Sequence, residues 1–227
     1  MIDEIPSQRY GIQPPMPAVY HSGDCFRQAG TGNWIDMRPF LTALAACVVA
    51  LPLSAASLDV QVTDAAGKAI EHAVVYAVPA VAVPVGRKVA VMDQKDRVFI
   101  PHVLPIQTGT WVEFPNSDNI RHQVYSVSPA KRFQLPLYIG KPAIPIQFPT
   151  PGIVAIGCNI HEQMSAYIVI VDTPYFATAD KGRATLPDLV AGQYTLRVWY
   201  PRMRKEPAPQ SVTLAADEKA TASFTIR

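Results

Sequence analysis

The sequence has no long stretch of helical periodicity, no marked excess of charge and few cysteines. Its 20 lysines and arginines nearly balance 18 aspartates and glutamates, which gives a net charge of +2. Because the basic residues are also dispersed along the chain, nucleic-acid binding has no support. What the sequence does contain is 22 prolines and many short runs of Val, Ile, Thr and Tyr. This composition predicts an all-β fold with frequent turns, and 227 residues allow one large or two small domains.

A membrane-spanning run is also missing. Residues 37–56 begin with Met and Arg, continue into an apolar stretch of about 15 positions and end in small residues, whereas a spanning helix needs roughly 20. This is the pattern of a secretory signal peptide, here cleaved after Ala55 or Ala56. It predicts export to the periplasm and a mature chain with no integral membrane span. A lipoprotein signal ending at Cys47 is the alternative.

Residues 1–36 precede this signal and are polar and without pattern. Because a signal peptide normally begins a chain, we expect them to be an over-extended gene start or a disordered extension, with Met37 as the initiator in the first case. Cys25 and Cys47 then fall in removed segments, and only Cys158 remains. A lone cysteine in an oxidising compartment forms no internal disulfide, so Cys158 is a buried inert thiol, a reactive thiol or a metal ligand.

The two ends of the exported chain share a strand–turn–strand pattern. Residues 57–80 predict a β-hairpin-like start, residues 179–198 repeat the pattern, and two further strands follow at 211–214 and 220–226. These segments resemble the carboxypeptidase regulatory-like family, a small Ig-like or transthyretin-like β-sandwich. In that family the halves are joined by a short stretch. We therefore predict a discontinuous domain of residues 57–86 plus 173–227, with a second domain, 87–172, inserted in it.

The inserted segment is also rich in predicted strands, at residues 110–114, 123–127, 152–158 and 167–171. A five-residue loop, 159–163, connects the last two. On the first of those two strands, alternation puts Cys158 on the same face as Val154 and Ile156. The sulfur of Cys158 is therefore predicted to point into the core.

Four residues of this segment have the chemistry of a metal site. Cys158, His161 and Met164 follow one another as Cys-x2-His-x2-Met, and His122 comes from a distant strand. A tight loop can fold a thiolate, an imidazole and a thioether around one point. Soft sulfur ligands suit Cu(I), imidazole suits both copper oxidation states, and two His, one Cys and a weak axial Met are the expected ligands of blue copper.

The same segment resembles the cupredoxin family of plastocyanin-like blue copper proteins. Besides the ligand loop, the resemblance rests on Phe114-Pro115-Asn116-Ser117-Asp118 leading to His122. It implies a Greek-key β-sandwich with one type 1 mononuclear copper ion. Equatorial ligands would be His122, Cys158 and His161, and the axial ligand would be Met164. Plastocyanins have more residues between the second His and the Met, so Glu162 is the alternative axial ligand.

The resemblance also implies supporting roles. Asn116 or Asp118 would brace the ligand loop by hydrogen bonds, with Asn159 as a further supporting residue. Two other histidines fit less well: His102 could ligate a second metal but is more simply an edge-strand residue, and His72 lies near a turn and should be solvated.

The predicted function is one-electron transfer by a periplasmic copper protein that is not itself an enzyme, works as a monomer or in a weak complex, and meets an unidentified redox protein. Alternatives are a copper-binding or delivery module and a structural docking protein of an exported complex. A hydrolytic cysteine enzyme is disfavoured because no oxyanion-hole signature is present and Met164 would have no role. Structural zinc usually recruits further Cys or His rather than Met.

Overall fold

The computed structural model describes residues 55–84, 86–142 and 144–226, which all belong to one compact unit. Every regular element in these ranges is a β-strand, so the all-β prediction is confirmed. The predicted extension, 1–36, and all but the last two residues of the predicted signal peptide, 37–56, lie outside the described residues. Within the described part of the chain, no helix is long and apolar enough to cross a membrane.

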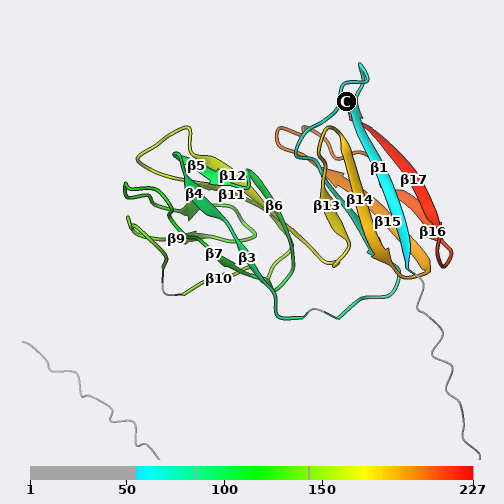
Figure 1. The fold of residues 1–227 in the computed structure, drawn as a ribbon, viewed down its shortest axis with the longest axis horizontal. Helices are drawn as coiled ribbons and strands as arrows, with labels where there is room; N and C mark the ends of the chain where they lie inside the picture. The colour runs from blue at the N-terminus through cyan, green and yellow to red at the C-terminus, as the bar shows by residue number, and fades with distance from the viewer. Residues whose placement is uncertain (1–54, 85, 143, 227) are drawn as a thin grey trace, which may run out of the picture. The chain divides into compact units, whose positions relative to one another are not determined.

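Two sheets enclose a first core. One has the strand order β14-β1-β17, in which β1 pairs antiparallel with β14 and parallel with β17 (Figure 1). The other has the order β13-β2-β15-β16. The strands are β1 (Ala56–Asp64), β2 (Val74–Pro79), β13 (Phe176–Thr178), β14 (Arg183–Leu189), β15 (Gly192–Trp199), β16 (Gln210–Leu214) and β17 (Lys219–Ile226). Their inward residues form one buried cluster that includes Leu58, Val60, Val75, Leu186, Leu196 and Phe224.

The predicted hairpin at residues 57–80 is wrong. Both strands form, but β1 and β2 lie in different sheets, and only an isolated bridge joins Thr63 of β1 to Ala69 in the turn. The alternation of Leu58, Val60 and Val62 turns one face of β1 toward the core, and β2 covers that core from the opposite sheet. Periodicity predicts which face of a strand is buried, but not which strand is its hydrogen-bonded neighbour.

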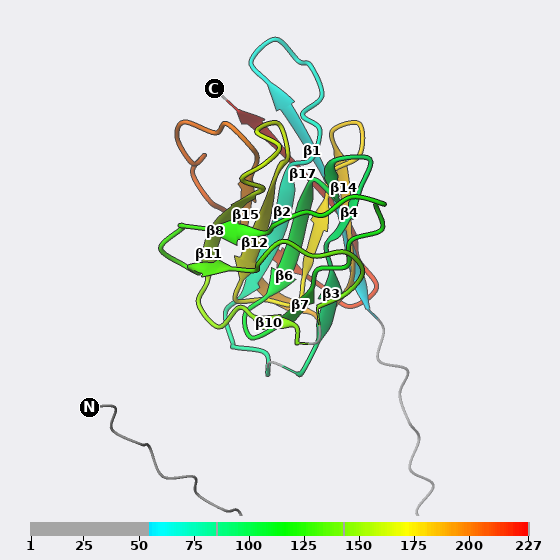
Figure 2. The ribbon, with the colours of Figure 1, turned by 90° about the vertical axis from the view of Figure 1, so that its left-hand side faces the viewer.

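A second set of strands encloses another core. Its largest sheet has the order β6-β12-β11-β8-β9, with β6 parallel to β12 (Figure 2). A three-stranded sheet, β10-β7-β3, and a hairpin, β4-β5, complete the set. The strands are β3 (Val89–Val91), β4 (Asp93–Lys95), β5 (Val98–Ile100), β6 (Val103–Gln107), β7 (Trp111–Glu113), β8 (Tyr125–Ser126), β9 (Phe133–Gln134), β10 (Ile146–Gln147), β11 (Gly152–Gly157) and β12 (Ser165–Val171). The four predicted strands of this segment correspond to β7, β8, β11 and β12.

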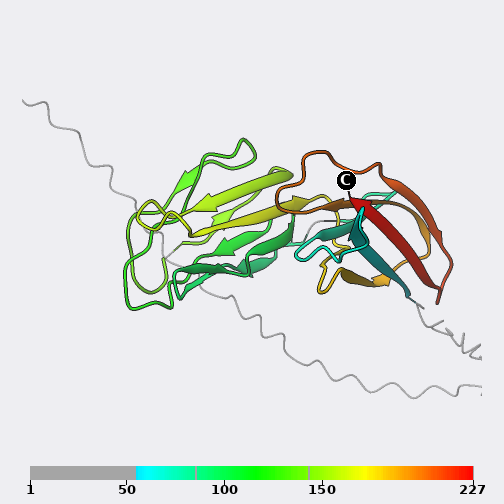
Figure 3. The same cartoon turned by 90° about the horizontal axis from the view of Figure 1, so that it is seen from above.

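The buried clusters divide along the sequence in the way that the two sets of strands do. One cluster draws on residues 56–77 and 179–226, and the other on residues 92–170. A third and smaller cluster combines Val74 with Val103, Val169 and Val171. Figure 3 shows the strands of both sets from above. The domain boundaries at 87 and 172, and the regulatory-like character of the flanking parts, stay predictions.

Candidate metal centre

The loop between β11 and β12 carries three of the four predicted ligands. Strand pairing ends at Gly157 opposite Ser165, so the loop is 158–164 rather than the predicted 159–163. It is closed by a hydrogen bond from the backbone N of Cys158 to the carbonyl of Met164, 3.2 Å, and by one from the N of Met164 to the carbonyl of His161, 2.9 Å. Cys158 therefore lies just beyond the strand on which it was predicted.

The side chain of Cys158 nevertheless points inward. Val154, Ile156 and Cys158 are all buried, whereas Ala155 between them is exposed. Strand alternation thus continues one residue past β11, as the sequence predicted. Cys158 is also the one free cysteine found in the described residues, and it is 5% exposed.

Three ligand atoms converge at this point. The Nδ1 atoms of His122 and His161 are 3.2 Å apart, and the Sγ of Cys158 is 3.8 Å from the Nδ1 of His161. All three atoms lie within 4.8 Å of one another. His122 is fully buried, while His161 is partly exposed. One sulfur and two imidazole nitrogens therefore converge on a common centre.

His122 is oriented by a carboxylate. Its Nε2 lies 2.6 Å from Oδ2 of Asp118, close enough for a charge-assisted hydrogen bond. Because a carboxylate only accepts, the ring proton sits on Nε2 and leaves the lone pair on Nδ1. That lone pair faces His161 and Cys158. The Asp118 hydrogen bond thus fixes the tautomer that a metal ligand requires.

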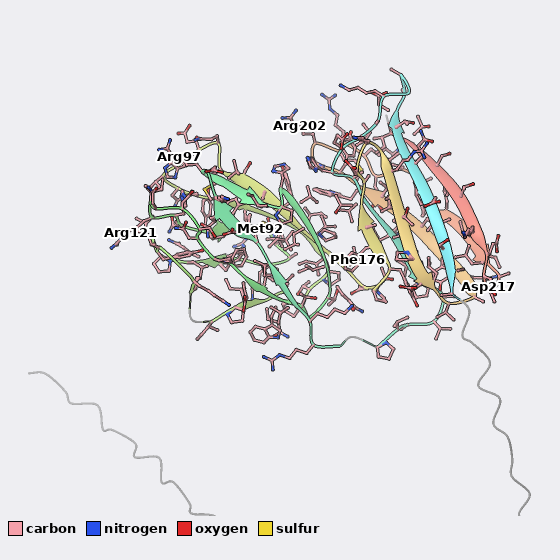
Figure 4. All side chains as sticks on the ribbon, viewed as in Figure 1. Met92, Arg97, Arg121, Phe176, Arg202 and Asp217 are labelled. Carbon is pink, nitrogen blue, oxygen red and sulfur yellow. The ribbon has the colours of Figure 1, made fainter. Side chains whose placement is uncertain are left out.

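Asp118 is itself held by the tip of the β4–β5 hairpin, where Figure 4 labels Arg97. It accepts hydrogen bonds from the backbone N of Asp96, 2.7 Å, and of Arg97, 3.0 Å. Both turn residues have positive φ, 55° and 57°, so the two central residues of the turn adopt the left-handed backbone conformation that favours tight β-hairpins. Desolvation raises the pKa of Asp118, but hydrogen bonds from His122, Arg97 and Asp96 outweigh it and hold that pKa below its ordinary value.

Asn116 shapes the segment that leads to His122. Its Nδ2 donates to the carbonyls of Ile120 and Tyr138, at 2.9 and 2.8 Å, and its Oδ1 accepts from the backbone N of Asp118. Among the described residues, the side chains of Asn116 and Asp118 form hydrogen bonds within residues 116–122, to Tyr138 and to the β4–β5 turn. None of these bonds reaches the 158–164 loop. Their support goes to His122, which differs from the predicted bracing of the ligand loop.

The sequence did not predict two further contacts of the site. The backbone N of Gln123 donates to the Sγ of Cys158 at 3.5 Å, which connects the two ligand segments directly. Tyr138 pairs with the backbone of His122, and its hydroxyl donates to the carbonyl of Phe114 and accepts from Gln94. Burial raises the pKa of Tyr138 to about 12. The position of Gln123 next to His122 could have predicted that its backbone lies near the ligand atoms. Nothing local in the sequence indicates the roles of Tyr138 or Gln94.

The remaining predicted residues lie around the loop in different ways. Met164 is 1% exposed and belongs to the same buried cluster as Cys158. Glu162 and Asn159 are exposed, and the Glu162 carboxylate is not part of the three-residue cluster. No hydrogen bond joins the Asn159 side chain to the cluster among the described residues. Cys158, Asn159, Glu162 and Met164 all line a surface hollow of about 380 Å³.

No protein-family model and no curated protein matches the chain. Among solved structures, it is similar to a copper-containing nitrite reductase from Thermus scotoductus, with 28% identity, a TM-score of 0.35, and 41% of this chain and 26% of that one covered. A reduced amicyanin variant is 20% identical, with a TM-score of 0.33 and coverage of 42% and 99%. A purple cupredoxin from Nitrosopumilus maritimus is 18% identical, with a TM-score of 0.32 and coverage of 37% and 99%. The chain thus spans about a quarter of the nitrite reductase and nearly all of the other two.

Proposed function

We propose that the chain binds one copper ion at a type 1 site and carries single electrons between redox partners in the periplasm. The observation that supports this most directly is the convergence of Sγ of Cys158 with Nδ1 of His122 and His161, all within 4.8 Å. One thiolate and two imidazoles in so small a space are the equatorial set of a blue copper centre. In this proposal Met164, buried beside Cys158, is the axial ligand.

The three ligand atoms fit a copper ion better than a structural zinc ion. A structural zinc site closes four strong ligands around the ion, usually with more than one Cys. Here the described residues bring one Cys and two His together, and the Asp118 carboxylate is engaged with the far side of His122. When bound, copper supplies a couple that takes up or gives away one electron.

The residues of the chain hold the ligand geometry fixed. Asp118 locks the His122 ring, and the amide of Gln123 donates to the Cys158 sulfur. His122, Cys158 and Met164 are at most 5% exposed, so protein atoms rather than water surround their donor atoms. Such preorganisation limits the rearrangement that accompanies electron transfer. The partly exposed ring of His161 is the proposed route for the electron.

Optical and paramagnetic-resonance spectra of the Cu(II)-loaded protein test this proposal. We expect an intense visible band from thiolate-to-copper charge transfer and a narrow copper hyperfine splitting. Cys158→Ser should abolish both, whereas Ser165→Ala, on the exposed first residue of β12, should leave both unchanged. A copper-loaded wild-type protein without the intense band would exclude a type 1 site.

Copper delivery is a second candidate, favoured by the hollow that Cys158 lines together with Glu162 and Met164. A thiolate with an open side can pass its metal to another set of ligands. The two functions predict different rates. A carrier exchanges electrons with a small redox reagent much faster than it loses Cu(I) to a chelator, whereas a delivery module loses Cu(I) readily and exchanges electrons slowly.

A further inference from the structure

Two histidines outside the metal centre face each other. His72 lies in the turn between β1 and β2, and His102 in the turn between β5 and β6, so it is not the edge-strand residue that the sequence suggested. Both are exposed. Their ring centroids are 5.8 Å apart, with 63° between the ring planes. Nothing in the proposed electron transfer uses this pair.

Both turns are anchored, so the pair is not a chance meeting of two free side chains. The backbone N of His72 donates to the carbonyl of Ala179, 3.2 Å, and the carbonyl of His102 accepts from the N of Tyr167, 3.0 Å. Beyond the two histidines, Val74 and Val103 are buried in one shared cluster. This packing fixes the two turns relative to each other.

The orientation of each imidazole is restricted as well. The Tyr167 ring packs edge-to-face against His102, with centroids 5.8 Å apart and planes at 89°. His72 has a φ of 60°, in the left-handed region, and its position there is held by the Ala179 hydrogen bond. Side-chain freedom that metal binding would otherwise have to remove is therefore already reduced.

The distance between the ring centroids is one that two imidazoles on a single metal ion can adopt. With metal–nitrogen bonds of about 2 Å, two imidazoles on one ion have centroids about 5 Å apart at a tetrahedral angle and about 6.4 Å apart in line. The observed 5.8 Å falls between these values. For comparison, the His122 and His161 rings, whose Nδ1 atoms converge, have centroids 4.9 Å apart and planes at 65°. The two pairs thus have similar angles between their ring planes, with a wider separation for His72 and His102.

We propose that His72 and His102 form a second metal site, which binds an exchangeable divalent transition-metal ion such as Zn²⁺ or Cu²⁺. Imidazole nitrogen is a preferred ligand of both ions. Two protein ligands leave the other coordination positions to water, so the ion exchanges with the solvent. Because the two turns belong to different parts of the fold, the bound ion connects them and stabilises the folded state.

Equilibrium binding of Zn²⁺ to the full chain tests the site, with the protein first given one equivalent of copper. His72→Gln, His102→Gln and the double variant should each lose the same single equivalent of Zn²⁺. Zn²⁺ should also raise the melting temperature of the wild type by several degrees more than that of the three variants.

Two outcomes would overturn the proposal. If the single variants bind as much Zn²⁺ as the wild type, the rings only pack against each other. If the double variant loses two equivalents where each single variant loses one, the histidines bind separate ions. Melting temperatures without metal show whether each variant is folded. The Zn²⁺ binding result is independent of the proposed electron transfer. The visible band reports on Cys158 and is unaffected by His72 and His102.

Discussion

At the scale of single residues, the geometry of the candidate metal centre depends on residues outside the proposed ligand set. Alternation along residues 154–158 was enough to predict the inward direction of Cys158. It could not predict that Asp118 joins His122 to the turn at Asp96 and Arg97, since these positions are 21 and 22 residues apart. Such contacts depend on how distant strands come together, and no local periodicity encodes them.

Removing the charge of Asp118 tests the tautomer argument. In Asp118→Asn the amide can donate to Nε2 of His122 and move the ring proton to Nδ1, the atom proposed to bind the metal. We expect copper affinity to fall roughly 10- to 100-fold. Competition with a chelator of known affinity measures this. Asp96→Asn is the matched control, because only the backbone of Asp96 contacts Asp118 and Asn tolerates positive φ. Equal affinities in the two variants would argue against the orienting role.

Tyr138 predicts a pH dependence of stability. Burial raises its pKa from 10.0 to about 12 in the folded protein. Between these values the unfolded chain loses the phenol proton while the folded protein keeps it, so the free energy of unfolding decreases as pH rises. The stabilisation is fully present below pH 10. Urea unfolding of the metal-free protein at intervals from pH 9 to pH 12 measures the decline.

Tyr138→Phe should flatten this alkaline decline. At neutral pH the free energy of unfolding of the same variant should fall by about 1–3 kcal/mol, because the Phe114 carbonyl loses its Tyr138 donor and Gln94 keeps only the Pro115 carbonyl as an acceptor. Tyr200→Phe controls for the loss of a tyrosine elsewhere in the chain. An unchanged alkaline slope in Tyr138→Phe would assign the decline to other groups.

At the scale of elements, the sequence predicted the strands well and their partners poorly. Strand β12 illustrates why. Ala166, Ile168 and Ile170 face the core that contains the metal centre, whereas Val169 and Val171 face the smaller shared cluster. With both faces buried, the run Tyr167 to Val171 is almost continuously apolar and carries little alternation. Its strand character was therefore predictable, but its position between two cores was not.

The proposed ligand role of Met164 can be tested separately from its packing role. Met92 and Met164 are both at most 1% exposed and lie in the same buried cluster. Replacing either by Leu conserves volume and should cost less than about 1.5 kcal/mol. Only Met164→Leu should change the spectrum and raise the reduction potential, because three ligands suffice for Cu(I) whereas Cu(II) gains more from a fourth donor. If Met92→Leu and Met164→Leu have the same spectrum and the same reduction potential, Met164 is not a ligand.

At the scale of the whole described unit, the small cluster of Val74, Val103, Val169 and Val171 joins segments that are far apart in sequence. Tyr76 and Trp199, from the sheet containing β2 and β15, pack against it, as does Tyr167 of β12. The ring centroids of Tyr167 and Trp199 are 5.3 Å apart. Because β12 begins immediately after the ligand loop, the same strand carries the site and this junction. We therefore expect metal binding and the cluster to be thermodynamically coupled.

Val169→Ala tests that coupling. Val169 is 1% exposed, and removing two methyl groups should lower the free energy of unfolding by about 2–3 kcal/mol through lost burial and the remaining cavity. Its side chain faces away from the metal-centre core, so the copper spectrum of the folded variant should not change. Guanidinium unfolding is followed by the copper band and by tryptophan fluorescence, in a background where Trp34 and Trp111 are replaced by Phe so that Trp199 is the emitter. If the unit is cooperative, both signals shift to lower denaturant together. Two separated transitions would mean that the parts unfold independently and that the cluster transmits no stability to the site.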